Sequence, residues 1–160
     1  MEIRLATDAD RAAIRAILEP VVRAGETYAL DRDMTREAAL AYWTAPDRQA
    51  FVAVDAGAVV GTYFLRANQA GGGSHVANAG YAVHPNAIGR GVARAMCAHS
   101  LDVAREQGFR AMQFNFVVST NAPAVHLWQA MGFRIAGTMA GGFHHPMHGY
   151  VDAYMMYRQL

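Results

Sequence analysis

The sequence predicts an α+β fold around one mostly antiparallel sheet. Stretches with the two-residue period of a strand are interrupted by stretches whose apolar residues recur at helical spacing. Their order along the chain is strand, two helices, three strands, helix, strand, helix, two strands. Two of the three consecutive strands are joined by a tight hairpin signal, which makes neighbouring strands antiparallel. This order does not match a repeated parallel βαβ unit.

The N-terminal part predicts one strand and two helices. Residues 2–6, Glu-Ile-Arg-Leu-Ala, alternate between polar and apolar, as in a half-buried strand. Thr7 suits the N-cap of a helix whose apolar residues keep helical spacing as far as Gly25. A loop over residues 26–33 then leads to a shorter helix over residues 35–43.

The middle of the chain predicts three strands in succession. Residues 51–54 and 59–65 are rich in β-formers and flank Asp55-Ala56-Gly57, a strong hairpin signal. The glycine-rich segment 71–74 predicts a flexible turn, and the next strand runs from about residue 75 to residue 83.

The following stretch predicts a helix, a strand and a second helix. Residues 89–107 place their apolar side chains on one side, and Gly108 suits the C-terminal end of that helix. Residues 112–118 read as a strand, and residues 122–131 as a helix stopped by glycine.

Two strands complete the expected fold, over residues 133–139 and 151–157. A polar, histidine-rich segment, residues 143–148, is expected to connect them. Adjacent histidines point apart in a strand, and their spacing is not that of a zinc site, so we expect a solvated or substrate-lining loop and no metal.

Composition limits the classes of function. The chain has 160 residues with 14 basic and 13 acidic side chains, so it offers no broad charged surface for nucleic acid or an anionic membrane. No apolar run approaches the roughly 20 residues that span a bilayer, and the first residues lack a signal-peptide pattern. Cys97 is the only cysteine, which excludes an internal disulfide. We therefore expect a cytoplasmic protein with a single domain over residues 1–160.

Residues 83–94, Val-His-Pro-Asn-Ala-Ile-Gly-Arg-Gly-Val-Ala-Arg, are the most informative stretch. A strand ends there, the chain turns through Gly89 and Gly91, and a helix begins. The first turn of a helix has unpaired N–H groups and a positive dipole end, so it binds anions. Arg90 and Arg94 lie one turn apart and can add contacts to phosphate. The alternative is an ordinary loop-to-helix junction with incidental glycines. A P-loop is excluded because no Gly-Lys-Ser or Gly-Lys-Thr occurs, and the third glycine of a dinucleotide fingerprint is missing.

This stretch resembles the acetyl-CoA motif of the GNAT (GCN5-related) N-acetyltransferases. That motif runs Val, four residues, Gln or Arg, two residues, Gly, one residue, then Gly or Ala. Here it reads Val83, Ile88, Gly91 and Ala93, with Ile88 departing from the Gln or Arg. A second family signature, Asn-x-x-Ala-x-x-Leu-Tyr-x-x-x-Gly-Phe, also appears. Its matching residues are Asn121, Ala124, Leu127, Gly132 and Phe133, with Trp128 in place of Tyr.

The resemblance implies a GNAT fold, a mixed and mostly antiparallel central sheet with a splayed strand pair, flanked by about four helices. It implies acetyl-CoA as the cofactor, with the pantetheine arm along one splayed strand and the pyrophosphate on main-chain N–H groups. The residues implied to bind acetyl-CoA are Tyr81, Ala82, Val83, Gly89, Arg90, Gly91, Val92, Ala93, Arg94, Asn121 and Trp128.

The acid–base residues that some family members use are absent. No Glu stands near Ala77, and Trp128 replaces the Tyr. We therefore consider Asn78 and Asn115 as catalytic candidates, although each amide can equally cap a neighbouring backbone group. Tyr154, or Tyr150, can protonate the departing thiolate, although most strand tyrosines simply pack.

The acceptor is expected to bind between the loop after the first helix and the segment before the last strand. The residues implied to contact it are Glu26, Thr27, Tyr28, Asn78, Phe143 and Tyr150. For Glu26 the alternative is a solvated loop carboxylate, and for Tyr28 it is a core residue.

The resemblance therefore implies acetyl transfer to the amine of a small molecule, with an amino acid or proline-like imino acid as the favoured acceptor. Two alternatives remain: a protein N-terminal or lysine acetyltransferase, and a CoA-binding module without catalysis. A small-molecule enzyme predicts a cleft closed by residues 143–150, whereas a protein-modifying enzyme predicts an open groove. We also expect a homodimer.

Overall fold

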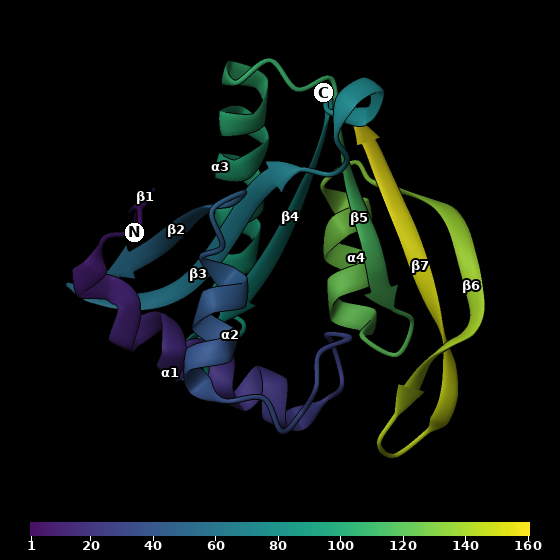
Figure 1. Cartoon of the computed structure of the whole chain (residues 1–160), viewed down its shortest axis with the longest axis horizontal. Coiled ribbons are helices and arrows are strands. Elements are labelled where there is room, and N and C mark those ends of the chain that lie inside the picture. Colours follow the sequence, from purple (N-terminus) through teal and green to yellow (C-terminus); the bar gives the residue numbers. More distant parts are fainter.

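The computed structural model describes residues 1–160 as one seven-stranded sheet with helices on both faces (Figure 1). The strands are β1 (Glu2–Leu5), β2 (Gln49–Asp55), β3 (Ala58–Ala67), β4 (Val76–Val83), β5 (Ala111–Val118), β6 (Arg134–His145) and β7 (Gly149–Gln159). The helices are α1 (Arg11–Ala24), α2 (Arg36–Trp43), α3 (Val92–Glu106) and α4 (Ala122–Ala130), with short 3₁₀ turns η1 (Asp8–Asp10), η2 (Gly71–Gly73) and η3 (Pro85–Ala87). The strand order is β1-β2-β3-β4-β5-β7-β6. The predicted fold class and order of elements are confirmed.

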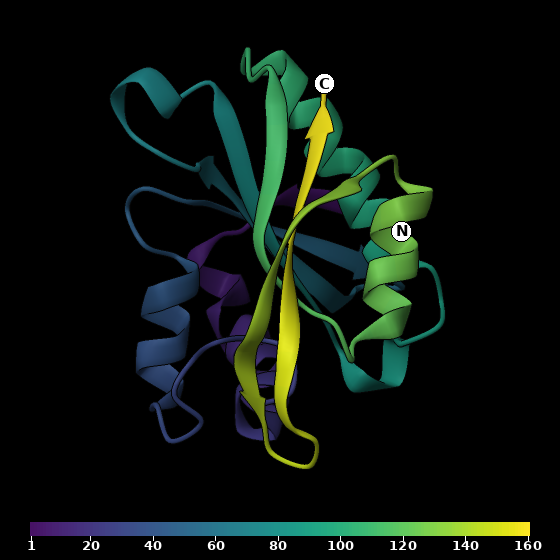
Figure 2. The ribbon, with the colours of Figure 1, turned by 90° about the vertical axis from the view of Figure 1, so that its right-hand side faces the viewer.

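The sheet separates two hydrophobic cores. α1 and α2 lie on one side of the sheet, and α3 and α4 lie on the other (Figure 2). On one face, α1 and α2 bury Ile17 and Trp43 against Phe64 of β3. On the other face, α3 and α4 cover a larger cluster that includes Met96 and Phe114. The two sets alternate along the strands because successive strand side chains point to opposite faces.

β4 and β5 are the only neighbouring strands that run parallel, and their pairing is short. It joins Val76 to Ala111 and Ala77 to Met112, and then stops. From there the two strands diverge toward the end of the sheet where α3 begins (Figure 1). The splayed strand pair implied by the sequence is therefore present.

Several boundaries differ from the sequence prediction, and two of these differences bear on the site. α3 begins at Val92 rather than at residue 89, because Gly89 and Gly91 have φ angles of +82° and +79° and cannot be helical. The histidine-rich segment was expected to be a loop, and this is wrong for its first part: Phe143 and His144 pair with β7, and only residues 146–148 form the turn. A register irregularity between Met139 and Phe143 lets the strand resume after the glycines.

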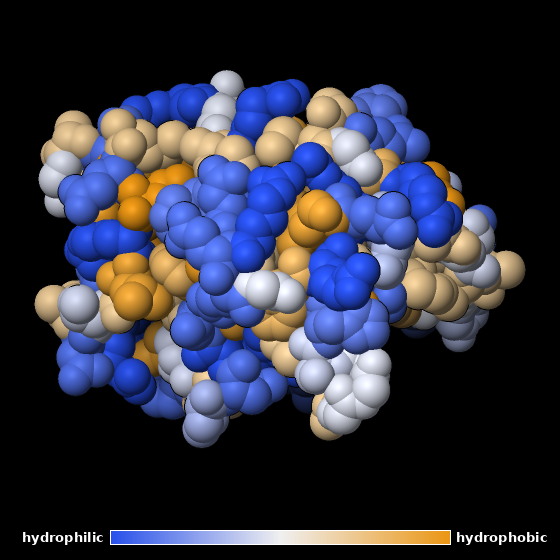
Figure 3. All heavy atoms as spheres, turned by 90° about the horizontal axis from the view of Figure 1, so that it is seen from above, coloured by the Kyte–Doolittle hydropathy of each residue, from blue (hydrophilic) through white to orange (hydrophobic).

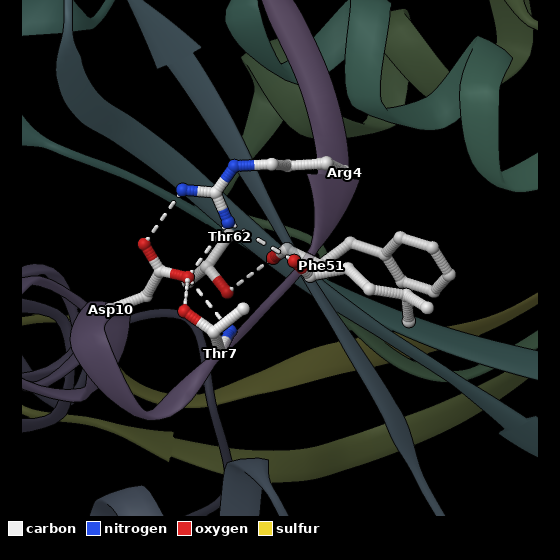
Figure 4. Close-up of polar contacts among 6 residues, drawn as sticks. Arg4, Thr7, Asp10, Phe51 and Thr62 are labelled. Carbon is white, nitrogen blue, oxygen red and sulfur yellow. Dashed lines mark hydrogen bonds and ion pairs between the residues drawn. The ribbon is translucent and has the colours of Figure 1, made fainter.

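A partly buried ion pair fixes the start of α1 (Figure 4). Arg4 of β1 donates two hydrogen bonds to the Asp10 carboxylate, at 2.8 and 3.0 Å. The backbone N–H and the hydroxyl of Thr7 donate to the same carboxylate, at 2.7 and 3.0 Å. These hydrogen bonds, with that of Arg4 as the largest cause, hold the pKa of Asp10 well below its usual range.

The outer surface is mixed. The face shown in Figure 3 is mainly hydrophilic, with hydrophobic residues in small separate groups. None of the helices combines the length and the apolar composition that crossing a bilayer requires.

Candidate active site

A cleft of about 610 Å³ opens where β4 and β5 part. Its walls come from the loop between α1 and α2, from β3, β4 and β5, from the first turn of α3, and from α4. Hydrophobic side chains make up most of the lining. The cleft thus reaches both faces of the sheet, with α3 and α4 at one side and the α1–α2 loop at the other.

The first turn of α3 forms one end of the cleft. Gly89, Gly91, Val92, Ala93 and Arg94 all line it. A Cβ atom built on Gly89 or Gly91 would meet no other atom within 4 Å, so open space lies in front of this helix terminus. Unpaired N–H groups and the dipole of a 15-residue helix point into that space. These residues fit a diphosphate such as that of coenzyme A.

Arg90 does not take part in this end of the cleft. Its guanidinium pairs with Asp55, the last residue of β2, and Arg90 is absent from the lining. The structure does not bring the Arg90 side chain into the lining, because the residue precedes the helix and its side chain turns toward Asp55. Every other residue implied to bind acetyl-CoA lines the cleft.

The open edge of β4 is partly occupied by a side chain. The Tyr28 hydroxyl donates to the Tyr81 carbonyl and accepts from the Tyr81 N–H, each at 2.8 Å. Burial raises the pKa of Tyr28 above its usual range, so the phenol remains a donor. Tyr28 thus satisfies the β4 backbone at a residue where β5 is too far away to do so.

The neighbours of Tyr81 differ in what their backbones can offer. The His84 N–H bonds to Val60 of β3, and backbone groups alternate between the two edges of a strand. Ala82 therefore directs its backbone toward β3, which corrects the expectation that its polar groups face the pantetheine arm. Val83, like Tyr81, directs them into the opening.

Asn78 stands at the residue where strand pairing stops. Its Nδ2 donates to the Gln113 carbonyl of β5 at 3.0 Å, and its Oδ1 accepts from Arg66 Nε at 3.1 Å. The side chain is only 7% exposed and lines the cleft. It therefore bridges the splayed strands, while one amide hydrogen and one oxygen lone pair remain for a ligand.

Asn115 belongs to a second chain of amides on the same face. Its Oδ1 accepts from Gln113 at 2.9 Å, and its Nδ2 donates to Asn68 at 2.7 Å. Asn115 also lines the cleft. Both asparagines have the capping contacts expected of a structural amide and the position expected of a site residue.

The α4 side of the cleft includes Asn121 and Trp128, as implied by the sequence. Asn121 caps α4 at the end of the β5–α4 turn. Trp128 is 8% exposed and packs against the rings of Tyr81 and Phe114, with centroids 5.0 Å away in each case. The indole thus forms a rigid wall.

Besides Arg90, four expected site residues lie outside the cleft lining. Glu26 is exposed on the α1–α2 loop, whereas its neighbours Thr27 and Tyr28 line the cleft. Phe143 is buried behind Phe116, with ring centroids 6.1 Å apart.

The other two residues outside the lining, Tyr150 and Tyr154, are on β7. Tyr150 is 76% exposed and stacks on His144. Tyr154 packs against the larger core. Neither tyrosine lines the cleft. Residues 27–30 of the α1–α2 loop line the cleft, and residues 143–150 do not.

The lining includes residues that were not predicted, among them Leu30, Tyr42 and Arg66. Arg66 carried a usable signal, because it is a charged residue near the end of an otherwise apolar strand. Leu30 and Tyr42 carried none, because apolar and aromatic residues in a loop or helix are most simply assigned to the core.

The family of this chain follows from its similarity to known proteins. The sequence profile described as "Acetyltransferase (GNAT) family" matches residues 13–133. The chain belongs to the GNAT family. It is an N-acetyltransferase domain by this membership, with the α3 terminus and the splayed strands in the positions that the family resemblance implied.

Individual GNAT proteins resemble this one over most of its length. A GCN5-related N-acetyltransferase from Kribbella flavida is 48% identical, with a TM-score of 0.94 over 99% of this chain and 97% of that one. The N-acetyltransferase aca1 of Schizosaccharomyces pombe is 30% identical, covering 84% of this chain and 72% of the relative.

A phosphinothricin acetyltransferase from Sinorhizobium meliloti, solved in complex with AcCoA, is 25% identical. Its TM-score is 0.85 over 99% of this GNAT chain and 88% of that structure.

Proposed function

We propose that this GNAT protein transfers an acetyl group from acetyl-CoA to the amine of a small molecule, an amino acid or proline-like imino acid, with residues 1–160 acting as one domain. The observation that carries the proposal is the position of the α1–α2 loop, which lines the acceptor side of the cleft. There the α1–α2 loop is fixed to β4 by the two hydrogen bonds of Tyr28. Thr27, Leu30 and Tyr42 line the space beside it.

The residues at the α3 end support acetyl-CoA as the acyl donor. The N–H groups of Val92, Ala93 and Arg94 are available to the diphosphate, and the Arg94 side chain adds a positive charge. Val83 offers backbone groups to the pantetheine amides. When bound, acetyl-CoA supplies a thioester whose carbonyl carbon is open to attack by an amine.

The titratable side chains of the lining are three tyrosines and two arginines: Tyr28, Tyr42, Tyr81, Arg66 and Arg94. Burial raises the pKa of both Tyr28 and Tyr81 above the usual range, so these phenols keep their protons at neutral pH. In our proposal the acceptor amine therefore loses its proton to water. Asn78 and Asn115 orient the amine through the hydrogen-bonding capacity that their structural contacts leave free.

A relative supports the acceptor class. The phosphinothricin acetyltransferase of Sinorhizobium meliloti is named for a small-molecule acceptor, and it shares this fold. An α1–α2 loop held against β4 is consistent with such an acceptor, whereas an extended peptide needs a continuous groove. The expected homodimer and cytoplasmic location stay predictions.

An acceptor screen tests the proposal. Release of free thiol from acetyl-CoA is measured with amino acids, imino acids, simple amines and short peptides. We expect turnover with amino or imino acids, and we expect Asn78→Ala to reduce that turnover roughly tenfold while CoA affinity is retained. Asn86→Ala is the matched control, because Asn86 is exposed and outside the cleft lining.

Other outcomes contradict the proposal. CoA binding without turnover of any amine would identify a binding module. Turnover confined to peptides would identify a protein acetyltransferase. Unchanged turnover in Asn78→Ala would remove Asn78 from the mechanism.

A further inference from the structure

The charge inside the cleft is entirely positive. Of its lining residues, Arg66 and Arg94 carry charge, and both are cations. Arg94 belongs to the diphosphate end, on the first turn of α3. Arg66 is on β3 and pairs with Asn78 of β4. Asn78 in turn lies five residues before Val83, near the opposite end of β4 from the α3 terminus. Arg66 is therefore a second, separate positive centre, on the acceptor side.

The Arg66 guanidinium has unused donors. Its Nε donates to Asn78 at 3.1 Å, and its Nη1 donates to Asp47 at 3.3 Å. Nη2 makes no hydrogen bond within the chain, and the side chain is 26% exposed. A guanidinium has five N–H donors in a fixed fork, so Arg66 can hold a ligand and keep both contacts.

A second arginine lies behind the same wall. The Arg48 side chain is 8% exposed, and its guanidinium carbon is 4.0 Å from the centre of the Tyr42 ring and 4.5 Å from that of Phe64. Both rings line the cleft. Nε and Nη1 of Arg48 are buried without a hydrogen-bond partner. Burying such donors unpaired is costly, so a nearby anion would be favourable.

One carboxylate cannot neutralise both arginines. Asp47 is 3.3 Å from Arg66 Nη1 and 3.7 Å from Arg48 Nε, and it is 59% exposed to solvent. Two buried or half-buried cations therefore share one well-solvated anion, which leaves the acceptor wall with a net positive charge. That charge acts in a partly desolvated place, where it is screened least.

We propose that Arg66, supported by the charge of Arg48, binds a carboxylate of the acceptor and so selects amino and imino acids over amines that lack one. This inference rests on the proposed function. Arg66 and Asn78 are hydrogen-bonded to each other, so a carboxylate on Arg66 brings its neighbouring atoms to Asn78. In an α-amino or α-imino acid the nitrogen and the carboxylate share one carbon, which fits this arrangement.

A substrate pair combined with a variant tests the inference. The amino or imino acid turned over fastest in the screen is compared with its own carboxamide, using wild type and Arg66→Met. We expect wild type to favour the acid. We expect Arg66→Met to lower kcat/KM for the acid roughly 10- to 100-fold, mainly through KM, the range of one charge-assisted contact. The carboxamide should change less than about threefold. The amine of the carboxamide has a lower pKa than that of the acid. This difference affects wild type and Arg66→Met equally, so it cancels when the two acid-to-carboxamide ratios are compared.

Controls separate recognition from structure. Arg66→Lys keeps a charge and should recover part of the loss. Arg105→Met removes an exposed arginine that pairs with Asp102 on α3, away from the cleft, and should leave the acid-to-carboxamide ratio unchanged. An equal loss for acid and carboxamide in Arg66→Met would mean that Arg66 only supports Asn78, and would overturn the inference.

The inference and the proposed function can fail separately. Turnover of simple amines as fast as of amino acids would overturn the inference and keep the acetyltransferase. If no amine were turned over, calorimetric titration of the CoA-bound protein with L-proline and L-prolinamide would still decide it. Tighter binding of the acid, lost in Arg66→Met, supports a carboxylate site, and equal binding of the two ligands overturns it.

Discussion

Asp10 shows how one residue can serve both the start of a helix and the anchoring of an edge strand. Its carboxylate accepts from Arg4 of β1 and from Thr7 at the start of η1 (Figure 4). These bonds stabilise the ionised form, so its pKa in the folded state lies below that of the unfolded chain. A lowered pKa means that Asp10 stabilises the fold above about pH 4 and loses this contribution as the pH falls.

We therefore expect Asp10→Asn to lower the free energy of unfolding by about 1–3 kcal/mol at neutral pH. The difference from wild type should shrink when urea unfolding is repeated near pH 3, where the wild-type carboxylate begins to lose its advantage. Asp8→Asn is the matched control, because the Asp8 side chain is fully exposed. Its one ion pair, with Arg11, is loose, with the charged atoms 3.9 Å apart. A pH-independent difference would contradict the role given to the charge.

The residues of the cleft differ in how visible they are to sequence reasoning. Gly91 was predictable because a helix start has local rules. For Tyr28 the sequence left two alternatives open, a contact with the acceptor or a place in the core. Its partner Tyr81 is 53 residues away, and no local pattern joins the two residues. Glu26 was wrongly assigned for a related reason: in a loop no periodicity shows which of two neighbouring side chains faces inward.

At the scale of elements, the residue just before α3 is a glycine with a positive φ angle, and the space in front of the helix terminus is open. Gly91 has φ +79°, and a Cβ added there would project into open space in front of the helix. We expect Gly91→Ala to destabilise the protein by about 1 kcal/mol through backbone strain. We also expect it to weaken CoA binding, roughly tenfold or more, because the methyl group occupies the place assigned to the diphosphate.

Gly108, at the other end of α3, provides the comparison. Its φ is +84°, and a Cβ there also meets nothing within 4 Å. Gly108→Ala should therefore show the same loss in urea unfolding with unchanged CoA affinity by calorimetric titration. Equal affinities for CoA in the two variants would exclude the α3 terminus as the diphosphate site.

Strand registers explain why some elements were predicted better than the residues on them. The β2–β3 hairpin and the order of the strands along the chain followed from periodicity and turn residues. The faces of β7 did not, because the β5–β7 register shifts between Phe114 and Val117. A slip of one residue moves every side chain to the opposite face, so Tyr154 could not be placed from sequence.

The whole molecule is a sheet divided between β4 and β5, with the α3 terminus at one end of the resulting cleft and the proposed acceptor side at the other. Its architecture was predictable because two spaced signatures and the element order agree with one another. The acceptor wall was not, since it assembles Tyr42, Arg66 and Asn78 from α2, β3 and β4. Contacts among three elements leave no trace in any single window of sequence.

The composition of the cleft predicts a particular pH dependence. With the pKa of Tyr28 and Tyr81 raised by burial, neither phenol ionises between about pH 6 and 9. We therefore expect kcat/KM to rise with pH as the acceptor amine loses its proton, and the inflection to shift when acceptors with different amine pKa values are compared. Initial rates over that range, for three or more acceptors, measure this. An inflection that stays fixed for all acceptors would instead reveal a base belonging to the protein.

The tether from Tyr28 to Tyr81 also bears on how acceptor choice can be re-engineered. The segment that covers the acceptor is anchored at its middle to the centre of the sheet, so its residue count is fixed by geometry. Insertions or deletions beside Tyr28 would detach the anchor, whereas exchanges at Thr27, Ala29 and Leu30 would reshape the wall and leave the anchor in place. Libraries directed at new acceptors should accordingly vary side chains at these positions and conserve length.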